Sequence, residues 1–72
     1  MPDNRVNINS ADAETLALAL DGVGMSKARD IIAYREENGE FKTVDDLQKV
    51  RGIGKATLER NRSRILLDDS TE

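Results

Sequence analysis

Leu20-Asp21-Gly22-Val23-Gly24 is repeated thirty residues later as Val50-Arg51-Gly52-Ile53-Gly54, and this repeat is the strongest indication of the fold. We call residues 20–24 hairpin one and residues 50–54 hairpin two. In both copies a short helical pattern precedes the Gly-apolar-Gly segment and a longer helical pattern follows it. Two copies in 72 residues predict a pseudo-twofold pair of helical units rather than an open solenoid.

The residues around the two hairpins predict four helices, over residues 13–20, 25–38, 44–49 and 55–64. Asp12 is a favourable N-cap for the first helix. Gly39 follows the second helix and is expected in the left-handed cap position. Thr43 and Asp46 resemble a capping box ahead of the third helix, with Asp in place of the usual Glu. The predicted fold class is therefore all-α.

The predicted core is small and mainly aliphatic, because 38% of the residues are apolar and only Tyr34 and Phe41 are aromatic. Both rings are expected to pack in the core rather than to stack on bases. Val6 and Ile8 alternate with polar residues in an extended lead-in and are expected to join the core. The full set of predicted core residues has helical spacing or lies between the glycines: Leu16, Leu20, Val23, Ala28, Ile31, Ile32, Phe41, Leu47, Val50, Ile53, Leu58 and Ile65.

The length and composition predict one small domain without catalytic chemistry. The domain is expected over residues 6–67, between flexible ends at 1–5 and 68–72. The absence of cysteine and histidine excludes disulfides, metal sites built from these residues, and histidine-based acid–base catalysis. Asp45-Asp46 and Asp68-Asp69 read as capping residues and a solubilising tail. We expect no enzyme activity, no catalytic residue and no metal ion held by such side chains.

Charge is distributed unevenly along the chain. Residues 1–40 hold four basic and eight acidic residues, a net charge of −4. Residues 41–67 hold seven basic and three acidic residues, a net charge of +4. Three acids in residues 68–72 bring the whole chain to −3. Since a surface can be locally positive on an acidic protein, the net charge does not exclude a nucleic-acid partner.

The Gly-apolar-Gly segments predict an anion site at each hairpin. Two glycines reverse the chain at positive φ without steric cost, and the apolar residue between them points inward. The second glycine lets another molecule approach the backbone closely. The next helix begins at once, so the amides of residues 25–27 and 55–57 have no intrahelical partner and can bind a phosphate. The side chains expected to assist are two hydroxyls and two ammonium groups, on Ser26, Thr57, Lys27 and Lys55.

Several stretches resemble the tandem helix-hairpin-helix domain of the ComEA family of competence-related DNA receptors. They are Val6–Ala11, Gly22–Ala28, Ile31–Lys42, Asp46-Leu47 and Gly52–Gly54, so that the resemblance covers about residues 6–67. It implies a compact tandem helix-hairpin-helix domain of four principal helices with pseudo-twofold symmetry. It also implies sequence-independent binding of double-stranded DNA, with the two hairpins contacting phosphates across a minor groove.

The resemblance further implies a role in DNA uptake, with a protein partner in the uptake system. Family members are exported, either anchored to the membrane or free in the periplasm. This chain has no apolar run of about 20 residues and no hydrophobic signal region, so no membrane contact by the chain itself is expected. A periplasmic or extracytoplasmic location follows only if it is part of a longer exported protein. Related hairpins also hold a monovalent cation on backbone carbonyls, here around Gly22, Gly24, Gly52 and Gly54.

The residues expected to bind DNA come from both hairpins and from the helices that follow them: Gly22, Val23, Gly24, Ser26, Lys27, Arg51, Gly52, Ile53, Gly54, Lys55, Thr57 and Arg60. Asp21 and Arg51 occupy equivalent positions, and only Arg51 attracts a phosphate. Hairpin two is therefore expected to be the stronger contact. In the alternative interpretation the chain is a protein-interaction module, whose acidic first half meets a basic partner while the hairpins serve only as turns.

Four further side chains carry expectations. Lys55 and Glu59 are four residues apart on a helix and are expected to neutralise each other in part. Arg35 is expected on a solvated face or on carbonyls near the Gly39 cap. Asn61 stands where the first repeat has Ile31, which predicts a less hydrophobic last helix.

Overall fold

The computed structural model describes residues 5–68, and its helices lie in the sequence between two short strands, one near each end. In chain order the elements are β1 (Val6–Asn7), α1 (Ala13–Ala19), α2 (Met25–Asn38), the 3₁₀ helix η1 (Val44–Lys49), α3 (Lys55–Asn61), the 3₁₀ turn η2 (Arg62–Arg64) and β2 (Ile65–Leu66). The predicted flexible ends lie outside the described residues except for Arg5 and Asp68, and their flexibility stays a prediction.

Side-chain caps fix where two of the helices begin. The Asp12 carboxylate accepts the Thr15 N–H at 2.9 Å and starts α1. At η1 the Thr43 hydroxyl accepts the Asp46 N–H, while the Asp46 carboxylate accepts the Thr43 N–H, each at 3.2 Å. Both caps confirm the expectation from the sequence. Gly39 ends α2 at φ 89° and ψ 178°, so its φ is positive but its conformation is not the left-handed helical one expected.

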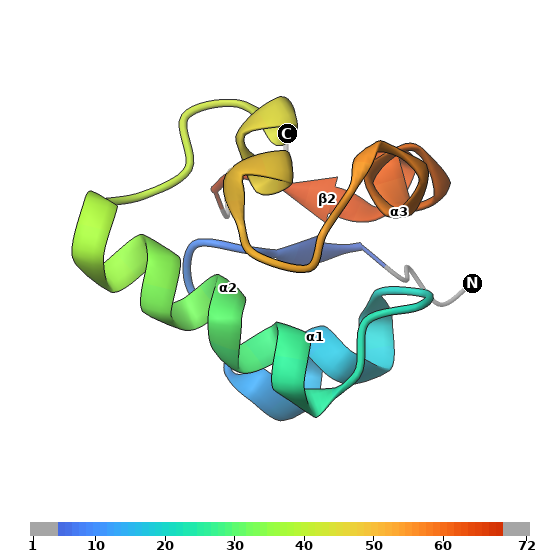
Figure 1. Cartoon of the computed structure of the whole chain (residues 1–72), viewed down its shortest axis with the longest axis horizontal. Helices are drawn as coiled ribbons and strands as arrows, with labels where there is room; N and C mark the ends of the chain where they lie inside the picture. The colour runs from blue at the N-terminus through green and yellow to red at the C-terminus, as the bar shows by residue number, and fades with distance from the viewer. Residues whose placement is uncertain (1–4, 69–72) are drawn as a thin grey trace.

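The two ends of the domain meet in a short parallel strand pair that the sequence analysis did not predict. Val6 lies opposite Ile65 and Asn7 opposite Leu66, and the Ile8 N–H continues the ladder to the Leu66 carbonyl at 3.1 Å. In Figure 1 the strands cross the middle of the molecule, with α1 and α2 on one side and α3 with the yellow η1 on the other. The pair thus joins the first repeat to the second.

The core confirms all but one of the predicted positions. Among residues 5–68, thirteen apolar residues are buried, including Val6 and Ile8, whereas Ile32 is only partly buried at the edge of this cluster. Tyr34 is partly buried and stacks on buried Phe41, with ring centroids 5.0 Å apart, so both rings pack on the core. The mostly helical domain confirms the predicted tandem helix-hairpin-helix fold, and the strand pair is a small addition to it.

Two details of the helices differ from the expectations. The last helix leaves α geometry after Asn61 and finishes as a 3₁₀ turn, because the chain must then extend into β2. Arg35 does not bond carbonyls near Gly39. Its Nη1 donates to the Ile8 carbonyl at 2.8 Å, and this bond ties α2 to the N-terminal lead-in.

Candidate functional site

The two hairpins have the same backbone conformation. Gly22 and Gly52 have φ values of 81° and 88°, in the region that favours glycine. The following apolar residues are buried, with Val23 4% and Ile53 3% exposed. Their N–H groups donate to the Leu20 carbonyl at 3.3 Å and to the Val50 carbonyl at 3.1 Å. Val23 and Ile53 therefore pin the turns to the core, and their side chains are not available to a ligand.

The second glycines are not required by the backbone. Gly24 and Gly54 have φ values of −86° and −97° with extended ψ, which any residue adopts. A Cβ atom on either would meet no atom within 4 Å. The expectation that both glycines of each hairpin need positive φ is therefore wrong for the second one. The domain itself therefore leaves room for a side chain at both positions.

The helices that follow the hairpins begin without a side-chain cap. Neither Gly24 nor Gly54 supplies a capping side chain, whereas Asp12 and Thr43 cap α1 and η1. The first intrahelical bonds are Ala28 N–H to the Gly24 carbonyl at 2.9 Å and the matching Leu58 bond at 3.0 Å. The amides of residues 25–27 and 55–57 precede these bonds, and they are the free amide groups of a helix start.

Most of the predicted polar site residues are exposed on the two hairpins. Arg51 and Lys55 are exposed, Ser26 is exposed, and Lys27 and Thr57 are partly buried. Within residues 5–68, the cations of Lys27, Arg51 and Lys55 make no ion pair. None of these three cations is in an ion pair with a carboxylate of the described part of the chain, and only Lys55 has a recorded charge interaction, with Glu59.

Arg60 is the predicted site residue whose surroundings differ most from the expectation. Its Nε lies 3.7 Å from Oδ2 of Asp21, and both side chains are about half exposed. Asp21 is therefore more than an isolated repulsive charge in hairpin one, because it also neutralises a basic side chain from α3. Asp21 and Arg60 are 39 residues apart, so no pattern within one helix could indicate their contact.

Asn61 is a buried polar residue whose contacts with hairpin one were not predicted from the sequence. It is 1% exposed, and its Oδ1 accepts the Asp21 N–H at 2.7 Å. Its Nδ2 donates to the carbonyls of Asp21 and Thr57, both at 2.9 Å. A polar residue at the position of apolar Ile31 was the available signal, and its significance lies in these contacts with hairpin one.

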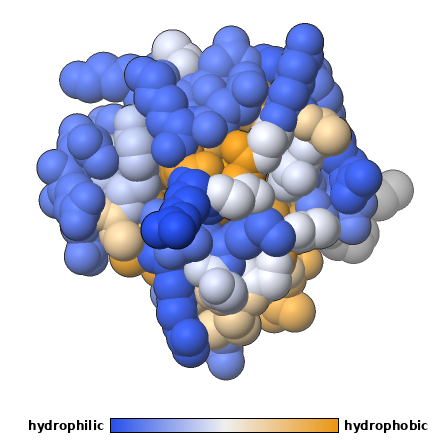
Figure 2. All heavy atoms as spheres, in the orientation of Figure 1, coloured by the Kyte–Doolittle hydropathy of each residue, from blue (hydrophilic) through white to orange (hydrophobic). Residues whose placement is uncertain are grey.

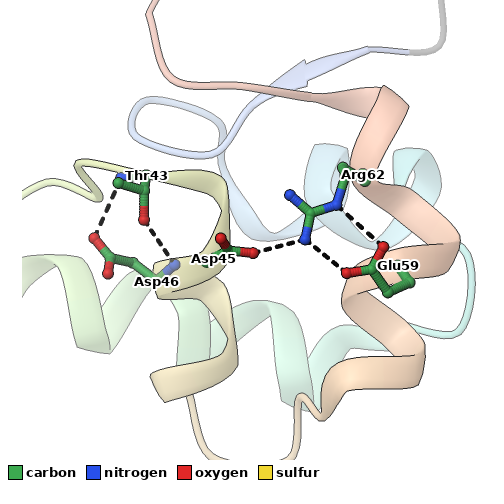
Figure 3. A network of polar contacts seen from close by, with 5 residues as sticks. All are labelled: Thr43, Asp45, Asp46, Glu59 and Arg62. Carbon is green, nitrogen blue, oxygen red and sulfur yellow. Dashed lines mark hydrogen bonds and ion pairs between the residues drawn. The ribbon is translucent and has the colours of Figure 1, made fainter.

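A cluster of charges joins η1 to α3. In Figure 3 the Arg62 guanidinium lies between Asp45 of η1 and Glu59 of α3, with Nη2 2.6 Å from Asp45 Oδ1 and 2.6 Å from Glu59 Oε2. The hydrogen bond from Arg62 lowers the pKa of Glu59, and the hydrogen bonds that Arg62 donates to both carboxylates, with Glu59 first, raise the pKa of Arg62. Glu59 therefore hydrogen-bonds Arg62, while the charge of Lys55 lowers the pKa of Glu59 to a smaller extent, in line with the expected partial neutralisation.

The described residues give no sign of a metal site. Across residues 5–68 no group of three or more acidic, histidine or cysteine side chains is placed to hold a metal ion. The monovalent cation expected on the hairpin carbonyls stays a prediction. No helix in the same range is both long and apolar enough to cross a membrane.

The surface is mainly polar. The face in Figure 2 is mostly hydrophilic, with apolar atoms showing in its centre and along its lower edge. Among the described residues, the large apolar side chains most exposed are Leu18, at 88%, and Met25, at 39%.

Comparison with known proteins supports the helix-hairpin-helix interpretation. Residues 2–66 match the family model described as helix-hairpin-helix motif. The chain is 55% identical over 60 residues to ComE operon protein 1 of Bacillus subtilis, covering 83% of this chain and 29% of that protein. It is 48% identical over 63 residues to an uncharacterized protein of Haemophilus influenzae, covering 88% of this chain and 56% of that protein.

A similar segment occurs in a larger animal protein. The human endonuclease/exonuclease/phosphatase family domain-containing protein 1 is 46% identical over 61 residues, which is 85% of this chain and 10% of that protein. The chain thus spans about half or less of the length of these relatives. The matches confirm the resemblance to competence-related helix-hairpin-helix proteins that was stated from the sequence.

Proposed function

The chain belongs to the helix-hairpin-helix family, and from this premise we propose that it binds double-stranded DNA through backbone phosphates, without sequence preference. The observation that carries the proposal is the pair of uncapped helix starts behind Gly24 and Gly54. Both glycines leave open space where a side chain would stand, although their φ values do not demand glycine. Amides without an intrahelical partner suit an anion. Two such helix starts on one small domain suit two phosphates of one duplex.

The charges of the hairpins support the same function. Lys27, Arg51 and Lys55 make no ion pair within the described part of the chain, so their ammonium and guanidinium groups are available to phosphates. The contacts proposed here are backbone amides and cations that meet phosphates, and phosphate contacts carry no sequence information directly. Binding should therefore depend on the phosphates and hardly on the sequence.

The relatives support a place for this binding unit in larger proteins. One of them is named for the ComE operon, and we propose for this chain a part in competence, the uptake of DNA into the cell. Another is named for a nuclease and phosphatase family, but the match covers only 10% of its length. We assign to this chain the holding of DNA and no catalytic step.

The test is to titrate the purified chain with two unrelated duplexes of equal length. Binding is measured by fluorescence anisotropy at several salt concentrations. Both duplexes should bind alike. If about four phosphates are neutralised, log K should fall with log salt at a slope of roughly −3 to −4. A flat salt response, or a strong preference for one duplex, would overturn the proposal. Binding to a basic protein partner in place of DNA would favour the interaction-module interpretation.

A further inference from the structure

The first glycine of each hairpin is covered by a basic side chain from the other repeat. A Cβ atom on Gly52 of hairpin two would lie 3.4 Å from Cε and 3.6 Å from Cγ of Lys27. Lys27 belongs to α2, which follows hairpin one. A Cβ atom on Gly22 of hairpin one would lie 3.0 Å from Nη1 of Arg60, which belongs to α3 after hairpin two. The two contacts therefore cross between the repeats.

The crossing is not a consequence of the sequence repeat. Thirty residues from Lys27 stands Thr57, and thirty residues from Arg60 stands Asp30. Each basic residue thus has a non-basic counterpart in the other repeat. The two hairpins obtain a cation from different positions of the opposite helix, and both cations arrive at the equivalent glycine.

Lys27 reaches hairpin two with its aliphatic stem. The side chain is partly buried, and its methylene groups lie along Gly52, at distances where an added Cβ would be in ordinary van der Waals contact with them. Lysine stems pack on apolar surface in this way while the ammonium group stays in water. Because Lys27 makes no ion pair within residues 5–68, its charge remains available beside hairpin two.

Arg60 is held beside hairpin one by two neighbouring contacts. Its guanidinium lies against Gly22 and is paired with Asp21 at 3.7 Å. The next residue, Asn61, holds the Asp21 backbone through bonds of 2.7 and 2.9 Å. The start of hairpin one and this part of α3 are therefore fixed to each other.

We propose that the phosphate at each hairpin receives its side-chain cation from the other repeat, with Lys27 serving hairpin two and Arg60 serving hairpin one. This rests on the proposed DNA binding. A cation that lies over the first glycine of a hairpin is close to the backbone that a phosphate would approach, whichever helix supplies it. The two hairpins then form one DNA-binding surface, in which damage to one repeat weakens the contact made by the other.

The test is a double-mutant cycle on DNA affinity in the full chain. Gly24→Val obstructs hairpin one, Gly54→Val obstructs hairpin two, and Lys27→Gln and Arg60→Gln remove one cation each. Lys27→Gln alone should weaken binding about threefold and reduce the salt slope by about 1. The same change should have little effect in a Gly54→Val background and keep its full effect in a Gly24→Val background. Arg60→Gln should have little effect in a Gly24→Val background and keep its full effect in a Gly54→Val background.

Two controls keep the cycle interpretable. Arg29→Gln removes the same charge from another face of α2, so its effect should be equal in both glycine backgrounds. Gly24→Ala and Gly54→Ala repeat the cycle with a smaller obstruction in case a valine variant does not fold, which circular dichroism checks. Coupling of Lys27 to Gly24, or of Arg60 to Gly54, would overturn the crossing and leave the proposed function intact. Unchanged DNA affinity in both glycine variants would instead overturn the hairpin mode of binding.

Discussion

The side-chain amide of Asn61 holds the backbone of Asp21 from both sides, since Oδ1 accepts its N–H at 2.7 Å and Nδ2 donates to its carbonyl at 2.9 Å. Asn61 is buried at the end of α3, and Asp21 stands directly before the first glycine of hairpin one. A side chain of the second repeat thus replaces, for one residue, the backbone partners that a helix or a strand would supply.

Asn61→Leu should destabilise the domain, because it removes the amide and leaves the Asp21 N–H and carbonyl without these partners. Leaving buried polar groups unsatisfied costs about 1–3 kcal/mol, and we expect a loss of that size in the free energy of unfolding. Urea denaturation followed by circular dichroism measures it. Asn38→Ala is the matched control, because exposed Asn38 donates only to the Tyr34 carbonyl of its own helix. An Asn61→Leu domain as stable as the parent would contradict the assigned role.

The two glycines of hairpin two should respond differently to alanine. Gly52 has φ 88°, and alanine there should cost about 1–2 kcal/mol of stability. Gly54 is extended with open space around its Cα, so alanine should change the melting temperature little and weaken DNA binding more. Thermal unfolding and anisotropy titration of both variants separate the two effects. Equal loss of stability and binding in Gly54→Ala would mean that this glycine is only structural.

Much of this fold could be predicted because its signals are local. The limits of α2 follow from the spacing of its apolar residues and from Gly39, and the caps at Asp12 and Thr43 lie within four residues of their partners. The repeat gave the two hairpins in the same way. The burial of Val23 and Ile53 could be predicted because each lies between two glycines and is the residue of its turn that can anchor it to the core.

The remainder depends on contacts between distant residues. The pairing of Val6 with Ile65, the bond from Arg35 to Ile8 and the contacts of residues 60 and 61 with hairpin one join segments 27 to 59 positions apart. No periodic pattern encodes such contacts. Lys55 illustrates the same limit within one helix, because Glu59 had a second candidate partner, Arg62, whose position also allows it to bond Asp45.

Stability should fall in acid through the carboxylates that cap and join η1. The hydrogen bond from the Lys42 N–H lowers the pKa of Asp46 below its ordinary value of 3.8, and the hydrogen bond from the Lys49 side chain lowers it further. A carboxyl whose folded pKa is lowered adds stability that is complete above its unfolded pKa and is lost as the pH falls through the folded one. The loss attributable to Asp46 should therefore begin near pH 3.8 and continue below it.

Urea denaturation from about pH 6 to about pH 2 measures this loss. Asp46→Asn should reduce the dependence of stability on pH in the acid part of the range. Glu36→Gln is the control, because the exposed side chain of Glu36 makes no ion pair within residues 5–68. The stability of this variant should depend on pH in nearly the same way as the stability of the parent. A parent and an Asp46→Asn variant with the same acid profile would show that the cap does not carry the effect.

The charged residue before the first glycine of each hairpin, Asp21 or Arg51, should determine how much that hairpin contributes to DNA affinity. Arg51 has no carboxylate partner within residues 5–68, so it adds attraction for a phosphate at hairpin two. At hairpin one Asp21 both repels a phosphate and neutralises Arg60 at 3.7 Å. Arg51→Asp should therefore weaken DNA binding, and Asp21→Asn should strengthen it by releasing Arg60. Each change should be less than about fivefold and should shrink in high salt, because exposed charges are screened.

Anisotropy titrations of both variants at low and high salt check this asymmetry. Asp21→Asn is the informative substitution, because Asp21→Arg would place a second cation beside Arg60 and add a repulsion of its own. Glu37→Gln is the matched control: it removes one negative charge from the last turn of α2, about 18 Å along the helix from hairpin one, and should change affinity less than Asp21→Asn. If Asp21→Asn and Glu37→Gln have the same effect, the gain comes from net charge alone. If Arg51→Asp and Asp21→Asn both leave affinity unchanged, the hairpins do not contact DNA.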